Sequence, residues 1–231
     1  MVDVDATGLE PPSRRGESLG SAPSALERIR METRTLHHQL ESVVPILEPG
    51  AEEQTYRHYL EKLLGFHRPL EPVLFSRSGL RELGIRRAER EKAPWLARDL
   101  LGLGLRVEDL ALLPVCRSTP RLVTLGNALG CCYALECATL EAQLIFQELP
   151  QRLPRAMATA SSYLRCYGPQ TRSMWNLFIS ALEHHGRDES VQREMVATAR
   201  ETFSQLRDWL LLGDRTAANG SWLPAGTTTL A

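Results

Sequence analysis

The sequence predicts an all-α fold in which about seven helices pack into a single-domain bundle. Apolar residues recur at intervals of three and four along most of the chain, which is the period of a helix with one buried face. Alternating runs of β-branched residues are absent from the sequence, so no strand is expected. The chain has 231 residues, of which 43% are hydrophobic, and is therefore long enough to bury a full core.

The domain boundaries follow from local composition. Residues 1–23 are rich in Gly, Pro, Ser and charged residues, so we expect a disordered leader there. Residues 214–231 contain Gly, Pro and a run of Thr, and we expect them to form a flexible tail. The helical domain is therefore expected over residues 24–213.

The first three helices are bounded by capping residues, prolines and glycines. A helix is expected over residues 24–44, because Ser24 is a good N-cap and Pro45 cannot continue the helix. An apolar stripe over residues 51–74 predicts a second helix with a bend at its two prolines. A third helix is expected over residues 87–101, with an interruption near its proline and an end at a Gly-Leu-Gly turn.

Four more helices are expected in the second half of the chain. A long, largely apolar helix is predicted over residues 121–149. Shorter helices over residues 154–167 and 169–184 each begin at a proline, which is favoured in a first turn. The last helix, over residues 189–212, shows helical apolar spacing and ends before Gly213.

Charge and composition exclude several classes of partner. The net charge is −1 and the pI is about 6.6, whereas a protein that binds a phosphate backbone is visibly basic, so no nucleic-acid partner is expected. The longest apolar stretch, residues 122–146, contains Asn127, Glu136, Glu141 and Gln143, which would be costly in lipid. We therefore expect a buried helix of a soluble protein and no membrane partner.

The cysteines point to a reducing compartment. Their number, five, is odd, and no CxxC pair of the zinc-binding type occurs. The N-terminal residues carry acidic side chains and no apolar run, so no signal peptide is expected. The expected location is the cytoplasm.

The first predicted helix carries a stripe of three chemically distinct residues. Arg30, His37 and Glu41 lie at steps of seven and four, so they share one face of the helix. An imidazole ordered by a carboxylate is a good metal ligand, and a guanidinium about 10 Å away along the axis could meet a carboxylate of a large planar ligand. His38 lies about 100° away and is a weaker candidate. The alternative for His37 is an ordinary half-buried histidine.

This stripe resembles the first helix of heme oxygenases, in which a His ligates heme iron. The second helix, with a spaced Tyr, Leu and Phe run over residues 56–71 that ends in Pro-Leu-Glu, is also similar to that family. The last helix is similar to the closing helix of the family over residues 195–210. The resemblance covers residues 24–212. The second and last helices are alternatively ordinary core helices, because apolar stripes of this kind occur in any helical bundle.

The long helix resembles the distal helix of bacterial heme oxygenases, but it lacks that helix's glycines. The segment matches in frame at Tyr133, Leu135, Glu136, Thr139, Leu140, Gln143 and Ile145. In the family, the positions of Cys137, Glu141 and Ala142 are glycines, and that of Ala138 is usually Ser or Asp. Glycines allow the helix to kink and to lay its backbone over the porphyrin face.

The resemblance implies a site in which Glu141 points towards the open side of the iron. There the carboxylate could ligate ferric heme, order water, swing out to solvent or pair with a cation, because an unpaired buried carboxylate is costly. Together with Cys137 and Ala138 it would form the distal, catalytic side. The alternative is a core helix with Glu141 exposed to solvent.

The function implied by the resemblance is O2-dependent cleavage of heme to biliverdin, iron and CO, with heme as both substrate and cofactor of this oxidoreductase. His37 would be the proximal iron ligand and Glu41 would orient it. Arg30, Arg172 and Tyr133 would complete the heme-binding set, the two arginines as contacts to the ring carboxylates, although both are alternatively surface charges. Electrons would come from a separate reductase or ferredoxin, and a bilin-binding photoreceptor could take up the product.

Two other functions stay open at the level of sequence. One is a heme- or bilin-binding protein that has lost catalysis together with the distal glycines, and the other is a helical scaffold without a tetrapyrrole. A carboxylate-bridged di-iron site would need repeated ExxH pairs on facing helices, and Glu61, Glu136 and Glu141 lack such His partners.

Overall fold

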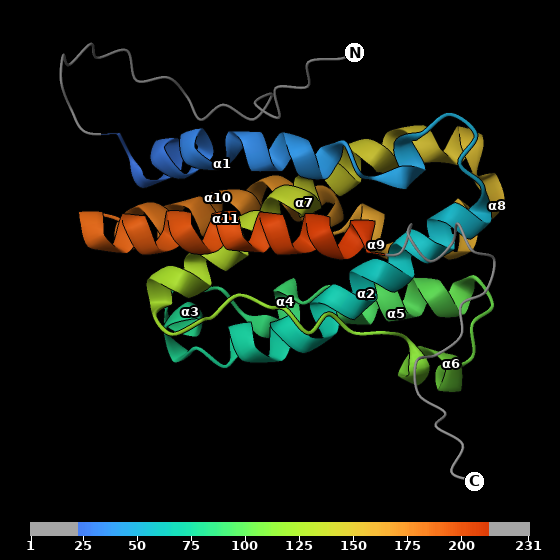
Figure 1. Cartoon of the computed structure of the whole chain (residues 1–231), viewed down its shortest axis with the longest axis horizontal. Helices are drawn as coiled ribbons and strands as arrows, with labels where there is room; N and C mark the ends of the chain where they lie inside the picture. Colours follow the sequence, from blue (N-terminus) through green and yellow to red (C-terminus); the bar gives the residue numbers. More distant parts are fainter. Residues whose placement is uncertain (1–22, 213–231) are drawn as a thin grey trace, which may run out of the picture.

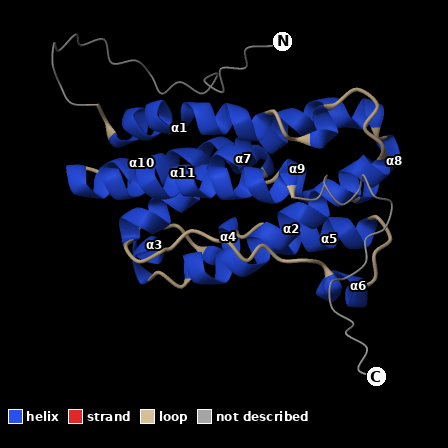
Figure 2. Ribbon diagram, in the orientation of Figure 1, coloured by secondary structure: helices blue, strands red, loops and turns tan. Residues whose placement is uncertain are grey.

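The computed structural model describes residues 23–212, and every regular element in that range is helical (Figure 2), which confirms the expected all-α class. The expected tail, and the expected leader up to residue 22, lie outside the described residues. In chain order the elements are α1 (Ala25–Glu41), η1 (Pro45–Leu47), α2 (Glu53–Phe75), α3 (Ser78–Glu82), α4 (Arg87–Arg90), α5 (Ala93–Gly102), α6 (Val107–Leu112), α7 (Leu125–Arg152), α8 (Pro154–Thr159), α9 (Ser162–Arg165), η2 (Gly168–Gln170), α10 (Thr171–His185) and α11 (Glu189–Leu211).

The helices form two layers (Figure 1). In one layer α1, α10 and α11 run along the long axis of the molecule, with α7 behind α11, and α2 to α6 form the other layer. Within residues 23–212, α7 is the one helix long and apolar enough to cross a membrane, but 67% of its most apolar window is buried inside the molecule. It is therefore a core helix along which α11 packs, and α1 in turn packs on α11.

The first helix begins where the sequence predicts and ends earlier. Ser24 is the N-cap and forms a capping box with Glu27, which satisfies two backbone amides of the first turn. The helix ends at Glu41, and a turn then leads to a separate 3₁₀ segment that begins at Pro45, the residue expected to stop it. His37 is thus in the last full turn of α1, on rigid backbone.

Several other boundaries differ from the expectations in ways that proline and capping explain. α2 continues through Pro69 and Pro72 as one helix. The third predicted helix is divided into α4 and α5, because Pro94 is placed in the first turn of α5 rather than inside a helix. The predicted helix over 154–167 is also divided, into α8 and α9. The short helices α3 and α6 were not predicted.

Three carboxylates cap the start of a helix other than their own. Glu71 of α2 accepts hydrogen bonds from the amides of Lys92 (2.6 Å) and Ala93 (3.1 Å) at the start of α5. Asp99 of α5 likewise accepts from two amides at the start of α9, and Glu183 of α10 from two at the start of α1. Each carboxylate satisfies amides that lack a partner within their own helix and sits at the positive end of its dipole. These contacts fix how the helices are placed relative to one another.

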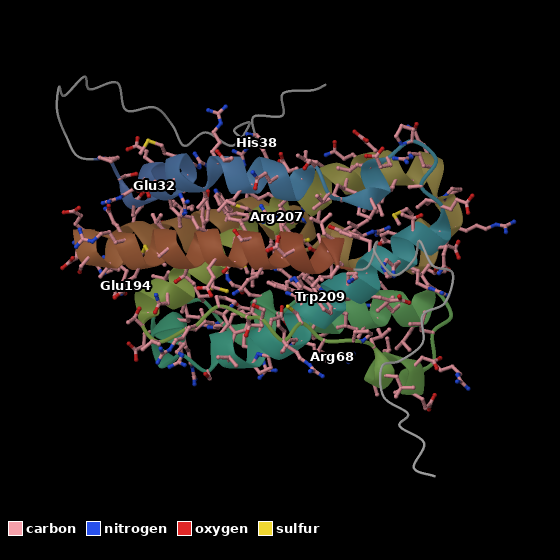
Figure 3. All side chains as sticks on the ribbon, viewed as in Figure 1. Glu32, His38, Arg68, Glu194, Arg207 and Trp209 are labelled. Atoms are coloured by element: carbon pink, nitrogen blue, oxygen red, sulfur yellow. The ribbon has the colours of Figure 1, made fainter. Side chains whose placement is uncertain are left out.

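The closest approach of two long helices is between α7 and α11. A Cβ atom added at Gly130 would lie 2.1 Å from the carbonyl oxygen of Met195, so only glycine allows this separation. At the same end, the hydroxyl of Thr124 donates to Glu194 of α11 (2.6 Å), which Figure 3 labels. The packing of α7 on α11 therefore sets the rotation of α7 about its own axis, and so decides which of its residues face each neighbour.

The carboxyl-terminal half of α7 is held from another side. The side-chain amide of Gln143 donates to the carbonyl oxygen of Gly168 (3.3 Å) and to the hydroxyl of Thr171 at the start of α10. These contacts tie the turn of α7 that carries residue 143 to the loop that precedes α10.

A second buried polar cluster links α4, α5 and α7 away from α1. Glu136 accepts from the hydroxyl of Tyr167 (2.7 Å) and pairs with Arg90 (3.0 Å), and Lys92 donates to the same hydroxyl (2.5 Å). Both cations are almost fully buried, and burial lowers the pKa of Lys92. The cluster thus neutralises the buried carboxylate of Glu136 with two cations.

Replacement of Glu71 by Gln should lower the free energy of unfolding by about 3 kcal/mol at neutral pH, because a buried, hydrogen-bonded charge is lost. Burial raises the pKa of Glu71, but the hydrogen bond from His67 and those from Lys92 and Ala93 outweigh it, so the pKa lies below its usual 4.5. The contribution of Glu71 to stability is thus complete above that usual value and is lost as the pH falls through the lowered pKa.

Urea unfolding at a series of pH values between about 3 and 7 measures this effect. The wild type should lose more stability than Glu71→Gln on acidification, whereas the exposed control Glu82→Gln should follow the wild type. Parallel pH profiles for the wild type and Glu71→Gln would contradict the assignment.

Candidate functional site

The imidazole of His37 faces the interior of the bundle. Its side chain is 19% exposed, and its ring packs edge-on against Phe203 of α11, with the ring centroids 5.4 Å apart. Helical periodicity places it one turn below the buried Thr33, whose hydroxyl donates back to a carbonyl of α1. Packing against the aromatic ring restricts the imidazole, so its nitrogens have a defined direction.

Glu141 of α7 lies directly opposite His37. Its carboxylate contacts Nε2 of His37 across the space between the two helices, and its side chain is only 17% exposed. The alternative that Glu141 points to solvent is therefore wrong. The contact between His37 and Glu141 joins α1 to α7. Glu141 stands at a position where the distal helix of the resembled family has a glycine.

Glu41 does not form the hydrogen bond to His37 that was expected. Its Oε1 lies 3.7 Å from Nδ1 of His37, which is too long for a hydrogen bond, whereas its Oε2 is 2.9 Å from Nδ1 of His38. The reason is that His38, one residue further on, also comes within reach of the flexible glutamate. His38 lies on the outer face of α1 in Figure 3 and is 54% exposed.

The contact between His37 and Glu141 changes the acidity of both groups. Burial lowers the pKa of His37, but the hydrogen bond and the charge of Glu141 outweigh burial, so the pKa is raised above 6.5. Burial raises the pKa of Glu141, and the neighbouring His37 opposes that rise. The contact therefore couples the protonation of the two side chains.

Other residues expected in the site lie one or two turns away along α1 and α7. Tyr133 and Cys137 of α7 face α1 near Arg30 and interact with each other. Burial raises the pKa of both side chains, and the positive charge of Arg30 opposes the rise. Arg30, Tyr133 and Cys137 thus form a second layer of contacts between α1 and α7, beside the His37–Glu141 pair.

A small cavity adjoins the pair. Its volume is about 10 Å³, enough for about one water molecule. Its lining combines apolar side chains with Glu141 and two tyrosines: Leu40, Val44, Tyr59, Leu63, Ala138, Glu141, Ile145, Tyr163, Leu206 and Leu210. This cavity is therefore too small to hold a porphyrin.

Arg172 is not brought to the site. It is exposed in the first turn of α10 and forms no ion pair or hydrogen bond within residues 23–212. Its expected role followed from the spacing of apolar residues in α10, and that spacing fixes the buried face of a helix but not the destination of an exposed side chain.

No site role was predicted for Phe203, Tyr59 or Tyr163. Phe203 packs on His37, and the two tyrosines line the cavity. In the sequence these residues belong to the apolar stripes of their helices. Such a stripe identifies buried residues but does not separate a residue that faces a ligand from an ordinary core residue. Glu136, matched to the family helix, is instead part of the buried network with Arg90.

Comparisons with known proteins agree on one family. The sequence matches the family model described as heme oxygenase over residues 24–211. The fold is similar to a crystal structure of the NO- and CO-bound heme oxygenase from Neisseria meningitidis, with a TM-score of 0.64 and 18% sequence identity. The similarity covers 89% of this chain and 99% of the Neisseria chain. A search of curated proteins finds no match.

Replacement of Glu141 by Gln should lower the pKa of His37, because the carboxylate favours the charged imidazole. An NMR titration of the His37 ring protons measures the shift. Glu148→Gln, an exposed change on the same helix, should leave the titration unchanged. A His37 pKa that is the same in Glu141→Gln and the wild type would show that the pair does not persist in solution.

Proposed function

Because the chain belongs to the heme oxygenase family, we propose that it binds heme between α1 and α7 and cleaves it in an O2-dependent reaction to biliverdin, iron and CO. In this proposal His37 is the proximal iron ligand. A separate reductase or ferredoxin supplies the electrons, and a bilin-binding photoreceptor is a possible acceptor of the product.

The observation that carries the proposal is the direction of the His37 ring. Its Nε2 points from α1 towards α7, and the atom is shielded from solvent. Imidazole nitrogen is a common ligand of iron, and the packing of Phe203 on the ring favours one orientation of the donor. The donor chemistry of this position therefore fits heme iron.

The space around His37 fits heme only after the site opens. Heme has to break the His37–Glu141 contact and to separate α1 from α7, because the adjoining cavity holds about one water molecule. The affinity for heme is reduced by the free energy of this opening.

Within the opened site, each residue has a distinct contribution. Heme supplies the oxidative chemistry when bound, and the protein supplies position and polarity. Arg30 supplies a positive charge on the α1 side for a ring carboxylate. Glu141 is the one acidic group of α7 that faces His37, and Cys137 and Ala138 lie beside it on the same helix.

The cytoplasm is the location that fits this proposal. The five cysteines are all free, and a reducing compartment keeps thiols in that state. Two of them, Cys131 and Cys132, are adjacent and buried in the core of α7.

His37→Ala should abolish tight heme binding, because the variant removes the only proposed protein ligand of the iron. Titration of the purified chain with hemin, followed by the Soret band, measures the affinity. His58→Ala, an exposed histidine on α2, is the matched control and should bind as the wild type does. Unchanged affinity in His37→Ala would remove His37 from this role.

Glu141→Gly should raise the rate of heme turnover by about tenfold, since loss of a contact worth about 1.4 kcal/mol frees His37 and the space above it. The assay follows the Soret band and the rise of a bilin band after a reductant and air are added. Glu148→Gly carries the same helix penalty of about 1 kcal/mol without touching the site.

Equal or slower turnover in Glu141→Gly than in Glu148→Gly would show that the carboxylate does not obstruct the reaction. A Soret band that persists in the wild type under these conditions, with no bilin band, would instead identify a heme carrier.

A further inference from the structure

We propose that His37, Glu41 and Glu141 bind one divalent transition-metal ion, such as Fe²⁺ or Zn²⁺, when heme is absent. One ligand atom from each of the three side chains can be chosen so that all three lie within 4.8 Å of one another. Within residues 23–212 this is the one group of three or more His, Cys, Asp or Glu side chains that comes together in this way.

A second observation supports a ligand at this position. Nε2 of His37 and Oε1 of Glu141 are both shielded from solvent, and they contact each other while neither atom has a further hydrogen-bond partner. Such atoms are costly to bury unless they are fully paired. A cation between the helices would satisfy both atoms at once.

The donor set is appropriate for a borderline metal ion. One imidazole nitrogen and two carboxylate oxygens are ligands used by zinc and by non-heme iron. Ligand distances of about 2.0–2.2 Å place neighbouring ligand atoms about 3.4 Å apart in a tetrahedron. The three ligand atoms lie within 4.8 Å of one another, so Glu41, which now faces Nδ1 of His37, has to rotate towards the metal to complete three ligands, and a position for water is left.

The charge of the site also fits a divalent cation. Two carboxylates balance a 2+ charge when His37 is neutral. His38 is the remaining charged neighbour from α1, and it binds the oxygen of Glu41 that does not face His37. The buried network around Glu136 offers no comparable site, because Arg90 and Lys92 neutralise that carboxylate.

The ion and heme would exclude each other, because both require His37. This exclusion rests on the proposed function, whereas the metal site itself does not. It implies that the resting protein is closed by a bound ion and that heme has to displace that ion as well as the Glu141 carboxylate.

The test uses the full chain without heme and Co²⁺ as the spectroscopic probe. Titration should give visible absorption bands that saturate at one Co²⁺ per chain, and Zn²⁺ should displace the Co²⁺. Glu41→Gln and Glu141→Gln keep the side-chain shape and should each weaken binding by about tenfold or more. The control Glu148→Gln should bind as the wild type does, and circular dichroism checks that each variant is folded.

Absence of Co²⁺ binding to the wild type, or binding that is unchanged in both glutamate variants, would overturn the metal site. Heme titration of the same samples keeps the two proposals apart. If His37→Ala loses Co²⁺ and retains heme, the proposed heme ligand is wrong and the metal site stands. If the wild type binds heme through His37 but not Co²⁺, the metal site is wrong and the proposed function stands.

Discussion

The close approach of α7 to α11 is the constraint on which the site depends. Gly130 lets the two backbones touch, and this contact sets the rotation of α7 about its axis. Glu141 lies eleven residues further along, about three turns, and therefore returns to a face of α7 that this rotation determines. Since α1 packs on α11 as well, His37 and Glu141 are brought to the same space by a shared neighbour.

The rest of the bundle is positioned largely by buried polar groups. Glu71, Asp99 and Glu183 each bind the amino-terminal amides of another helix, so each links two elements in a fixed orientation. Apolar packing alone permits small sliding movements between helices, but a carboxylate bound to two amides does not. The position of α1 is thus fixed in part by Glu183 of α10, a residue outside the contact between His37 and Glu141.

Much of this arrangement could be predicted from sequence, since periodicity and capping are local properties. Ser24, His37 and the buried faces of the long helices follow from spacing within one segment. The family resemblance implied that Glu141 faces the site, beside the alternative of an exposed residue, and its side chain contacts His37. The competition of His38 for Glu41, the exposure of Arg172 and the closure of the space depend on side-chain rotamers and on distances between helices, which no local pattern encodes.

The anchoring of Gln143 indicates which wall of the site is fixed. Gln143 lies two residues after Glu141, about 200° around the helix, and its amide is bound to the loop before α10. Rotation of this turn of α7 about the helix axis, which would withdraw Glu141, would break the hydrogen bonds of Gln143. The carboxylate of Glu141 is therefore expected to withdraw by rotation about its own side-chain torsions, while the backbone of this turn of α7 stays in place.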